Sequence, residues 1–299
     1  MKLLLIRPRP EKETIGLQHV MIVEPLELEI LGACKRKQDS VTIVDMIIEK
    51  KSIEYFLKIH KPDVLCITGY ITNVGTIKAI CETAKRFDGK IKTVVGGVHC
   101  EVCPDDFNHP AIDYRVIRNA VTVFPKILDH IEYGSDIPAG VFKYGETLND
   151  KELPVIDFNY TFPDRSLTAG YRKKYFYIFH DKVALIKATF GCPFKCNFCF
   201  CRKITEEKYW QRDLENVIEE LESITEKEIY IVARVTILKW GETMLACWSS
   251  PLALLVTEGG LAYPISLTGE EITIDCLLAM APALKGIVEE QAQRQASAN

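Results

Sequence analysis

The sequence predicts an α/β protein whose N-terminal half is a doubly wound parallel sheet. Short runs rich in Val, Ile and Leu, bounded by polar or turn residues, alternate with segments of helical periodicity. Strand then helix, repeated, implies parallel strands joined by right-handed crossovers. The composition is globular, with 47% hydrophobic and 26% charged residues. At about 150 residues per domain, a length of 299 suggests two domains.

The first domain is expected to span residues 1–133. Its strands are buried apolar runs, expected at 2–6, 41–44, 64–68, 92–95 and 114–117. Helices are expected around 53–57, before the breaker Pro62, and around 74–84, because apolar residues recur there at helical spacing. These elements alternate in the order that a doubly wound sheet requires.

Turn-forming residues mark the next segment. Prolines, glycines and aspartates are frequent from 134 to about 164, which predicts an interdomain linker over 134–182. A strand at 183–187, a helix at 214–224 and a strand at 229–232 predict the start of a second domain over 183–232. Residues 233–299 are unassigned.

Charge and cysteine usage exclude several classes of protein. The net charge is −4 and no basic block is present, so general affinity for nucleic acid or an anionic membrane is not expected. The apolar run before Arg7 has only four consecutive residues, Leu3 to Ile6, too few for a signal peptide. No run reaches about 18 apolar residues, so no membrane span is expected. Eleven cysteines without an export signal favour reduced thiols or metal ligands. The sequence predicts a cytoplasmic protein.

Polar residues and glycines follow the third and fourth expected strands. The first loop is Thr68-Gly69-Tyr70-Ile71-Thr72-Asn73 and the second is Gly96-Gly97-Val98-His99. Open α/β sheets bind ligands beyond the carboxyl ends of their strands. Two glycines without a Cβ let the backbone approach a bulky ligand closely. A tight turn without a ligand is the alternative.

These loops resemble those of the cobalamin-binding domain that precedes the catalytic barrel in many radical S-adenosylmethionine enzymes. The matching segments are 24–28, 64–69 and 94–99. One departure is Arg118-Asn119-Ala120, where the family often has Gly-Glu-Gly. The resemblance implies that the corrin edge and the nucleotide tail of cobalamin are held by Thr68, Gly69, Tyr70, Ile71, Thr72, Asn73, Gly96, Gly97, Val98 and His99.

Other cobalamin proteins supply a lower axial histidine from the motif Asp-x-His-x-x-Gly. None of the six histidines here has an aspartate two residues before it. A bound cobalamin is therefore expected to lack a histidine ligand, as the resemblance also implies.

Cys100 and Cys103 form a Cys-x-x-Cys beside the glycine pair. This motif is a redox couple, half of a zinc site or two ordinary thiols. No second ligand pair lies nearby in the sequence, so neither cysteine is assigned a role.

Three cysteines follow the strand expected at 183–187, in the pattern Cys192-x3-Cys196-x2-Cys199. Thiolates in one loop select an iron–sulfur cluster or zinc. A 4Fe–4S cubane held by three cysteines has one iron without a protein ligand. That iron stays open to chelate S-adenosylmethionine. Zinc would need a fourth ligand, which Cys201 could offer, but no second cysteine pair has zinc-ribbon spacing.

The cysteine loop resembles the radical S-adenosylmethionine signature, including the preceding Gly191 and the aromatic Phe198. The resemblance implies that Cys192, Cys196 and Cys199 bind a 4Fe–4S cluster and that Phe198 packs near the adenine of S-adenosylmethionine. It also implies that 183–232 begin a (β/α) barrel.

The expected activity is that of a cobalamin-dependent radical S-adenosylmethionine enzyme, with methyl transfer as the leading reaction and ring closure or rearrangement as alternatives. In such enzymes S-adenosylmethionine methylates cobalt and also yields a radical that abstracts substrate hydrogen. The implied partners are a small-molecule or peptide substrate and an electron donor such as a flavodoxin or ferredoxin.

The resemblance stops at about residue 232. About 115 residues follow the start of the barrel strand, whereas a complete barrel takes about 250. Glu258-Gly259-Gly260 has the wrong order and position for the family's Gly-Gly-Glu ribose motif. An incomplete barrel, from a truncated or fused reading frame, is therefore expected. Two alternatives follow: a cobalamin and iron–sulfur binding protein without turnover, and a zinc-stabilised regulatory protein.

Overall fold

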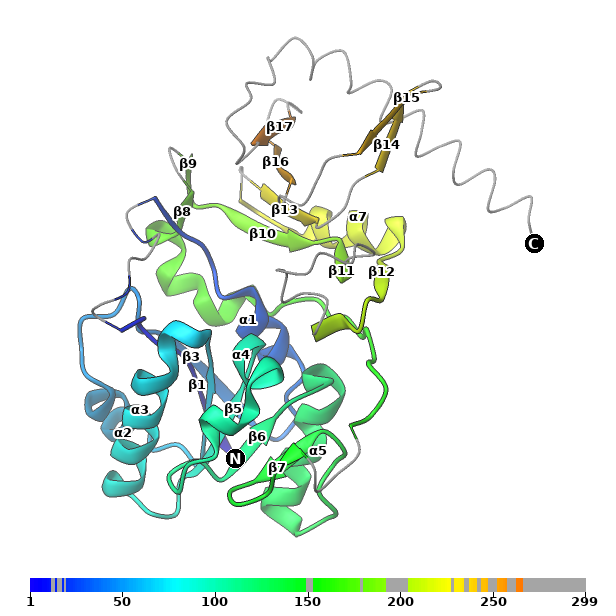
Figure 1. Ribbon diagram of the computed structural model, residues 1–299. Coiled ribbons are helices and arrows are strands. Elements are labelled where there is room, and N and C mark those ends of the chain that lie inside the picture. The colour runs from blue at the N-terminus through cyan, green and yellow to red at the C-terminus, as the bar shows by residue number, and fades with distance from the viewer. Residues whose placement is uncertain are drawn as a thin grey trace. The chain divides into compact units, whose positions relative to one another are not determined.

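The computed structural model describes residues 1–11, 14, 18, 20–148, 153–177, 180–191, 204–226, 229–233, 237–240, 243–246, 252–256 and 262–265. The chain divides into two compact units. The first comprises Met1–Phe179 and Phe194–Lys208, and the second comprises His180–Pro193 and Tyr209–Asn299. Figure 1 labels the elements of both units.

A six-stranded sheet forms the centre of the first unit, in the order β3-β1-β4-β5-β6-β7. The first five strands run parallel, and β7 is antiparallel to β6. The five predicted strands are confirmed to within one residue at each end, whereas β7 was not predicted. The strands are β1 (Lys2–Arg7), β3 (Ser40–Asp45), β4 (Val64–Thr68), β5 (Lys92–Gly96), β6 (Tyr114–Val116) and β7 (Val141–Lys143).

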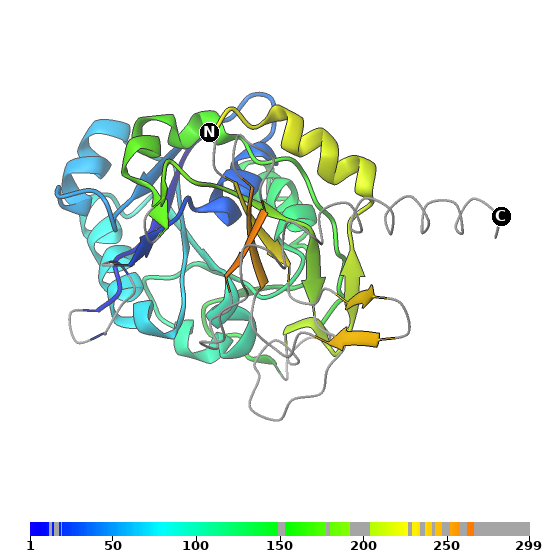
Figure 2. The same ribbon diagram turned by 90° about the horizontal axis from the view of Figure 1, so that it is seen from above.

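Helices cover both faces of this sheet (Figures 1 and 2). Side chains alternate along a strand, so Leu4 and Ile6 pack with α2 (Ile53–His60) and α3 (Val74–Phe87). Leu3 and Leu5 pack on the other face with α1 (Leu26–Ala33) and α5 (Ala120–Tyr133). The doubly wound α/β fold is confirmed. None of the helices in the described ranges has the length and apolar character that crossing a membrane requires.

The chain beyond α5 remains part of the first unit. After β7, the 3-10 helix η5 (Arg165–Lys174) packs on α1. Gly32 of α1 permits this approach, because a Cβ there would overlap Leu167 Cδ1. The two-residue strand β8 (Phe176–Tyr177) then pairs antiparallel with β2 (Met21–Ile22). Much of the segment expected to be a linker over 134–182 is thus included in this compact unit.

The second unit begins at His180 with the two-residue strand β9 (His180–Asp181). The next strand, β10 (Ala184–Lys187), pairs in parallel with β13 (Ile229–Ala233). Helix α7 (Leu214–Ser223) lies between them in the chain, so the predicted strand, helix and strand are confirmed. Beyond β13 the pairing becomes antiparallel, and the described sheet is β10-β13-β16-β17. The other two strands of this sheet are β16 (Leu252–Val256) and β17 (Ala262–Ile265). Two further pairs are antiparallel: β11 (Thr189–Gly191) with β12 (Tyr209–Gln211), and β14 (Ile237–Trp240) with β15 (Thr243–Ala246).

Candidate functional site

The candidate site lies at the carboxyl ends of two neighbouring strands. β4 and β5 pair in parallel, and Thr68 stands opposite Gly96. The two loops therefore leave the sheet side by side. The backbone N–H of His99 donates to Gly69 O at 3.3 Å, which joins them. The structure thus brings both predicted loops to one edge of the sheet.

Gly97 fixes how closely these loops pack. Its backbone has φ of +92° and ψ of −179°, a region open almost only to glycine. A Cβ at this position would overlap Thr68 Oγ1 and lie 3.2 Å from Gly69 N. The second loop can therefore lie against the first only with glycine here.

Gly96 has different surroundings. Its backbone angles are ordinary, and an added Cβ would meet only Val116, at 3.6 Å, which is ordinary van der Waals contact. Space next to its Cα is therefore available to a ligand that approaches the edge of the sheet.

The first loop is fixed by its own hydrogen bonds. Tyr70 N donates to Asn73 Oδ1 at 3.0 Å, and Asn73 N donates to Tyr70 O at 3.0 Å. This turn forms the 3-10 helix η2 (Ile71–Asn73). Asn73 is buried, whereas the side chains of Tyr70 and Ile71 are exposed. A rigid loop with two large exposed apolar side chains offers a surface that suits a flat apolar ring.

His99 is buried at the start of a short helix, α4 (Val98–Val102). Its Nε2 lies 2.7 Å from Asp106 Oδ2. Its ring packs edge-on against Phe107, with 5.7 Å between centroids. The helix was not predicted, since the sequence suggested a loop over 96–99.

The two thiols of Cys-x-x-Cys face different environments. Cys100 is fully buried and its Sγ donates to Val95 O at 3.6 Å. Burial raises the pKa of the Cys100 thiol. Cys103 is exposed and lies between α4 and the 3-10 helix η3 (Pro104–Phe107). Its Sγ, His99 and Asp106 have ligand atoms within 4.8 Å of one another.

The predicted cluster ligands lie outside the described residues. These are Cys192, Cys196 and Cys199, together with Phe198. The last described residue before the cysteine loop is Gly191, at the end of β11, and the description resumes at residue 204.

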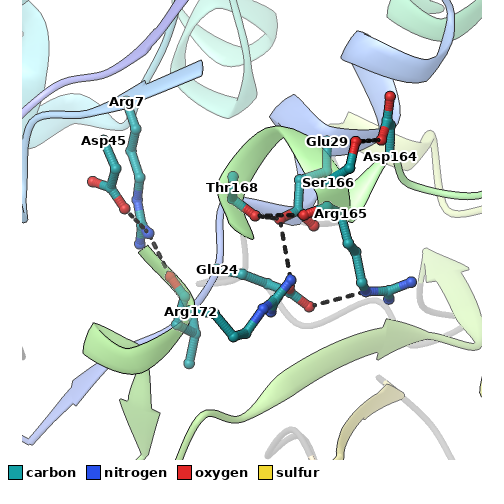
Figure 3. Close-up of polar contacts among 10 residues, drawn as sticks. Arg7, Glu24, Glu29, Asp45, Asp164, Arg165, Ser166, Thr168 and Arg172 are labelled. Atoms are coloured by element: carbon teal, nitrogen blue, oxygen red, sulfur yellow. Dashed lines mark hydrogen bonds and ion pairs between the residues drawn. The ribbon is translucent and has the colours of Figure 1, made fainter. Parts of the chain in front are cut away.

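A buried polar cluster joins η5 to α1 in the first unit (Figure 3). Glu24 forms ion pairs with Arg172 and, at 3.5 Å, with Arg165. Thr168 donates a hydrogen bond to Glu29 Oε1. Burial and the nearby Glu24 carboxylate raise the pKa of Glu29 to about 8. The cluster therefore holds a carboxyl group that titrates near neutral pH.

The sequence predicted neither the grouping of His99, Cys103 and Asp106 nor the polar cluster around Glu24 and Glu29. His99, Cys103 and Asp106 lie within eight residues of one another, so a search for metal-ligating side chains close together in the sequence would have found them. No comparable signal joins Glu24 to Arg172, because 148 positions separate them.

The family model for the B12 binding domain matches residues 14–128. This range contains both loops of the candidate site, 68–73 and 96–99. The predicted resemblance to cobalamin-binding proteins is therefore confirmed. A solved cobalamin-binding protein from Desulfitobacterium hafniense has 18% identity and a TM-score of 0.30, over 44% of this chain and 58% of that one.

Several of the curated relatives are named for methyl transfer. The chain is 27% identical to the hopanoid C-3 methylase of Methylococcus capsulatus, over 80% of this chain and 47% of that protein. It is 26% identical to an uncharacterized methyltransferase of Pyrococcus horikoshii, over 74% and 50%. The anaerobic magnesium-protoporphyrin IX monomethyl ester cyclase of Rubrivivax gelatinosus is 25% identical, over 56% and 32%. The chain thus spans about half the length of the first two relatives.

Proposed function

We propose that this chain, whose residues 14–128 form a B12-binding domain, is a cobalamin-dependent radical S-adenosylmethionine enzyme that transfers a methyl group. The observation that carries the proposal is the edge where β4 and β5 end. Gly97 brings the two loops together there, and Gly96 leaves space for a ligand. Both glycines lie within the matched residues.

The residues of this edge fit cobalamin. Tyr70 and Ile71 present exposed apolar surface to the corrin edge, and the backbone of Gly96 and Gly97 accepts the nucleotide tail at close range. Asn73 holds the first loop in shape through its contacts with Tyr70. When bound, cobalamin supplies a cobalt that accepts and donates a methyl group.

We infer that His99 does not bind cobalt. Its Nε2 is engaged with Asp106, and its ring is fixed against Phe107. The chain lacks the Asp-x-His-x-x-Gly motif. In this proposal His99 supports the second loop through its backbone contact with Gly69.

Cys192, Cys196 and Cys199 are the proposed ligands of a 4Fe–4S cluster, and Phe198 is the proposed contact for the adenine of S-adenosylmethionine. The support is the donor set, three closely spaced thiolates that leave one iron open. When bound, the cluster supplies one electron to S-adenosylmethionine. The names of two relatives favour methyl transfer, and the cyclase favours ring closure as the alternative. The proposed partners are a small-molecule or peptide substrate and a flavodoxin or ferredoxin.

One observation favours a second candidate function, cofactor binding without turnover. Within the described residues, the sheet of the second unit continues antiparallel after β13. A (β/α) barrel instead adds parallel strands. A chain with this sheet would hold cobalamin in its first unit without completing a barrel around the cluster.

The test is a metal count on the full chain, purified and reconstituted without oxygen in the presence of hydroxocobalamin. We expect about one cobalt and about four iron atoms per chain. The variant with Cys192, Cys196 and Cys199 all changed to alanine should lose the iron and keep the cobalt. Cobalamin that separates from the folded chain on desalting would contradict the cobalamin site. Two outcomes would contradict the cluster. Iron could persist in the triple variant, or the unchanged chain could bind zinc in place of iron and the triple variant lose that zinc.

A further inference from the structure

His99, Cys103 and Asp106 form a cluster of metal-ligating side chains in the first unit, and the proposed function uses only the backbone N–H of His99. His99 comes from α4, Cys103 lies between α4 and η3, and Asp106 comes from η3. One ligand atom from each of the three lies within 4.8 Å of the other two.

The backbone alone creates this arrangement. Cys103 N donates to His99 O at 2.8 Å, and Asp106 N donates to Cys103 O at 3.2 Å. Cys103 itself is non-helical, with φ of −135° and ψ of 68°, so these two backbone hydrogen bonds, and not a continuous helix, bring the three residues together. Pro104 begins η3, where its missing N–H costs no helical hydrogen bond. The three side chains therefore converge without needing contacts between themselves.

The side chains combine a fixed ligand with two accessible ones. His99 is 6% exposed, and packing against Phe107 sets its ring plane. Cys103 is exposed, and the side chain of Asp106 is 51% exposed. In a tetrahedral zinc site, neighbouring ligand atoms are about 3.3–3.8 Å apart. His99 Nε2 and Asp106 Oδ2 lie 2.7 Å apart, so the exposed side chain of Asp106 must rotate away from His99 for both to bind one metal ion.

We propose that His99 Nε2, Cys103 Sγ and a carboxylate oxygen of Asp106 bind one zinc-class divalent cation, with water as the fourth ligand. The donor set selects the metal. Calcium and magnesium take oxygen ligands, and an iron–sulfur cluster needs several thiolates. Imidazole, thiolate and carboxylate together are typical zinc ligands. As the metal binds, the contact between His99 Nε2 and Asp106 opens and the imidazole proton moves through solvent from Nε2 to Nδ1, which frees the Nε2 lone pair. The thiol proton of Cys103 passes to solvent as the metal–sulfur bond forms.

Cys100 takes no part in this site. Its thiol is buried and donates to Val95 O. The Cys-x-x-Cys therefore supplies one ligand, and the other two come from His99 and Asp106. This arrangement differs from half of a zinc ribbon, in which both cysteines bind the metal.

The experiment measures zinc binding by the full chain in the background with Cys192, Cys196 and Cys199 changed to alanine. This background removes the thiolates of the proposed cluster, which also bind zinc. Titration against a chromophoric zinc chelator gives stoichiometry and affinity, and a pH indicator detects the released proton. We expect one zinc ion per chain. In cobalt(II)-loaded, cobalamin-free protein, we also expect a thiolate-to-cobalt charge-transfer band.

Cys103→Ser and Asp106→Asn, both at exposed side chains, should each weaken zinc binding at least about tenfold. His99 is buried, so its replacement is not used. Asp105→Asn is the matched control, because Asp105 is the neighbouring exposed carboxylate and lies outside the trio. It should leave affinity unchanged. Absence of zinc binding in the triple-alanine background, unchanged affinity in Cys103→Ser, or an equal loss in Asp105→Asn would each overturn the proposal.

Discussion

Gly96 and Gly97 are adjacent, but they tolerate substitution differently. Gly97 has backbone angles that other residues rarely adopt, and it packs against Thr68. Gly96 has ordinary angles, and an added Cβ there would make only ordinary van der Waals contact with Val116. Replacing Gly97 therefore tests the stability of the fold, whereas replacing Gly96 tests the binding of the ligand.

Gly97→Ala should destabilise the chain by about 1–3 kcal/mol, because alanine must adopt a strained backbone and its Cβ overlaps Thr68 Oγ1. Urea unfolding monitored by circular dichroism measures this loss. Gly89→Ala is the control, since an added Cβ there would lie 4.0 Å from its nearest neighbour, Lys85 O. Its stability should stay within about 0.5 kcal/mol of the unchanged chain. Equal stability of the two variants would contradict the strained geometry.

Gly96→Ala should leave stability within about 0.5 kcal/mol and weaken cobalamin binding at least tenfold. Its Cβ meets only Val116 in the protein, at 3.6 Å, but occupies the space that the ligand needs. Titration of the full chain with hydroxocobalamin, followed by desalting and absorption spectroscopy, measures the change. Tight binding by this variant would show that cobalamin does not approach Gly96.

The importance of this glycine pair could be predicted from the sequence, but the role of each glycine could not. The sequence places two residues without a Cβ after an expected strand. Their roles depend on the register that sets Gly96 opposite Thr68, which is a property of the folded sheet. The contact between His99 and Asp106 also depends on a short helix, α4, that the apolar pattern does not reveal.

At the scale of elements, the docking of η5 on α1 is determined by long-range contacts. Leu167 packs beside Gly32, and Thr168 bonds Glu29. Sequence periodicity could not predict these contacts, because it reports only on residues a few positions apart. Sequence periodicity also could not predict β7, because this edge strand has only three residues and lies in a segment rich in turn formers. The longer buried strands were predictable because their apolar runs are continuous.

Glu29 should make stability fall as the pH rises. Its pKa is about 8 in the folded chain and 4.5 in the unfolded one. Between these values the folded chain keeps the proton and the unfolded chain loses it, so stability drops by about 1.4 kcal/mol per pH unit. Glu29→Gln is neutral at every pH and should remove this fall. Urea unfolding at about pH 5.5 and about pH 8.5 compares the two proteins.

Glu27→Gln is the control for this measurement, because Glu27 belongs to the same helix and is exposed. It should follow the unchanged chain at both pH values. If Glu29→Gln loses as much stability on alkalinisation as Glu27→Gln does, then Glu29 is not protonated in the folded chain at neutral pH.

At the scale of the whole molecule, the two units differ in how fully they match the expected fold. The first contains a doubly wound sheet. Within the described residues, the second contains one parallel strand–helix–strand unit followed by antiparallel strands. The start of the second unit could be predicted from its apolar periodicity. The antiparallel pairing could not, because pairing direction depends on contacts that a single strand pattern does not encode.

The second candidate function, cofactor binding without turnover, predicts that the chain binds cobalamin and iron but turns over little S-adenosylmethionine. The described sheet of the second unit is open, with β10 and β17 at its edges. An open sheet leaves a radical site accessible to water and other quenchers. Reduced, reconstituted protein with S-adenosylmethionine should form less than about one 5′-deoxyadenosine per chain, measured by chromatography. The triple alanine variant gives the background. Many turnovers above that background would contradict the expectation.

The antiparallel contact between β2 and β8 also affects how the protein is made. Strands β1 and β3 to β6 of the six-stranded sheet and helix α5 are all synthesised by Tyr133, but η5, which packs on α1, and β8, which pairs with β2, follow and extend to Tyr177. A ribosome adding about 5–20 residues per second needs about 2–9 seconds for this interval. During it, Glu24 and Glu29 have emerged before Arg165 and Arg172 exist to pair with them. The nascent chain therefore passes through a stage in which α1 is present without its covering segment, and this is the stage at which a chaperone or a protease would meet it.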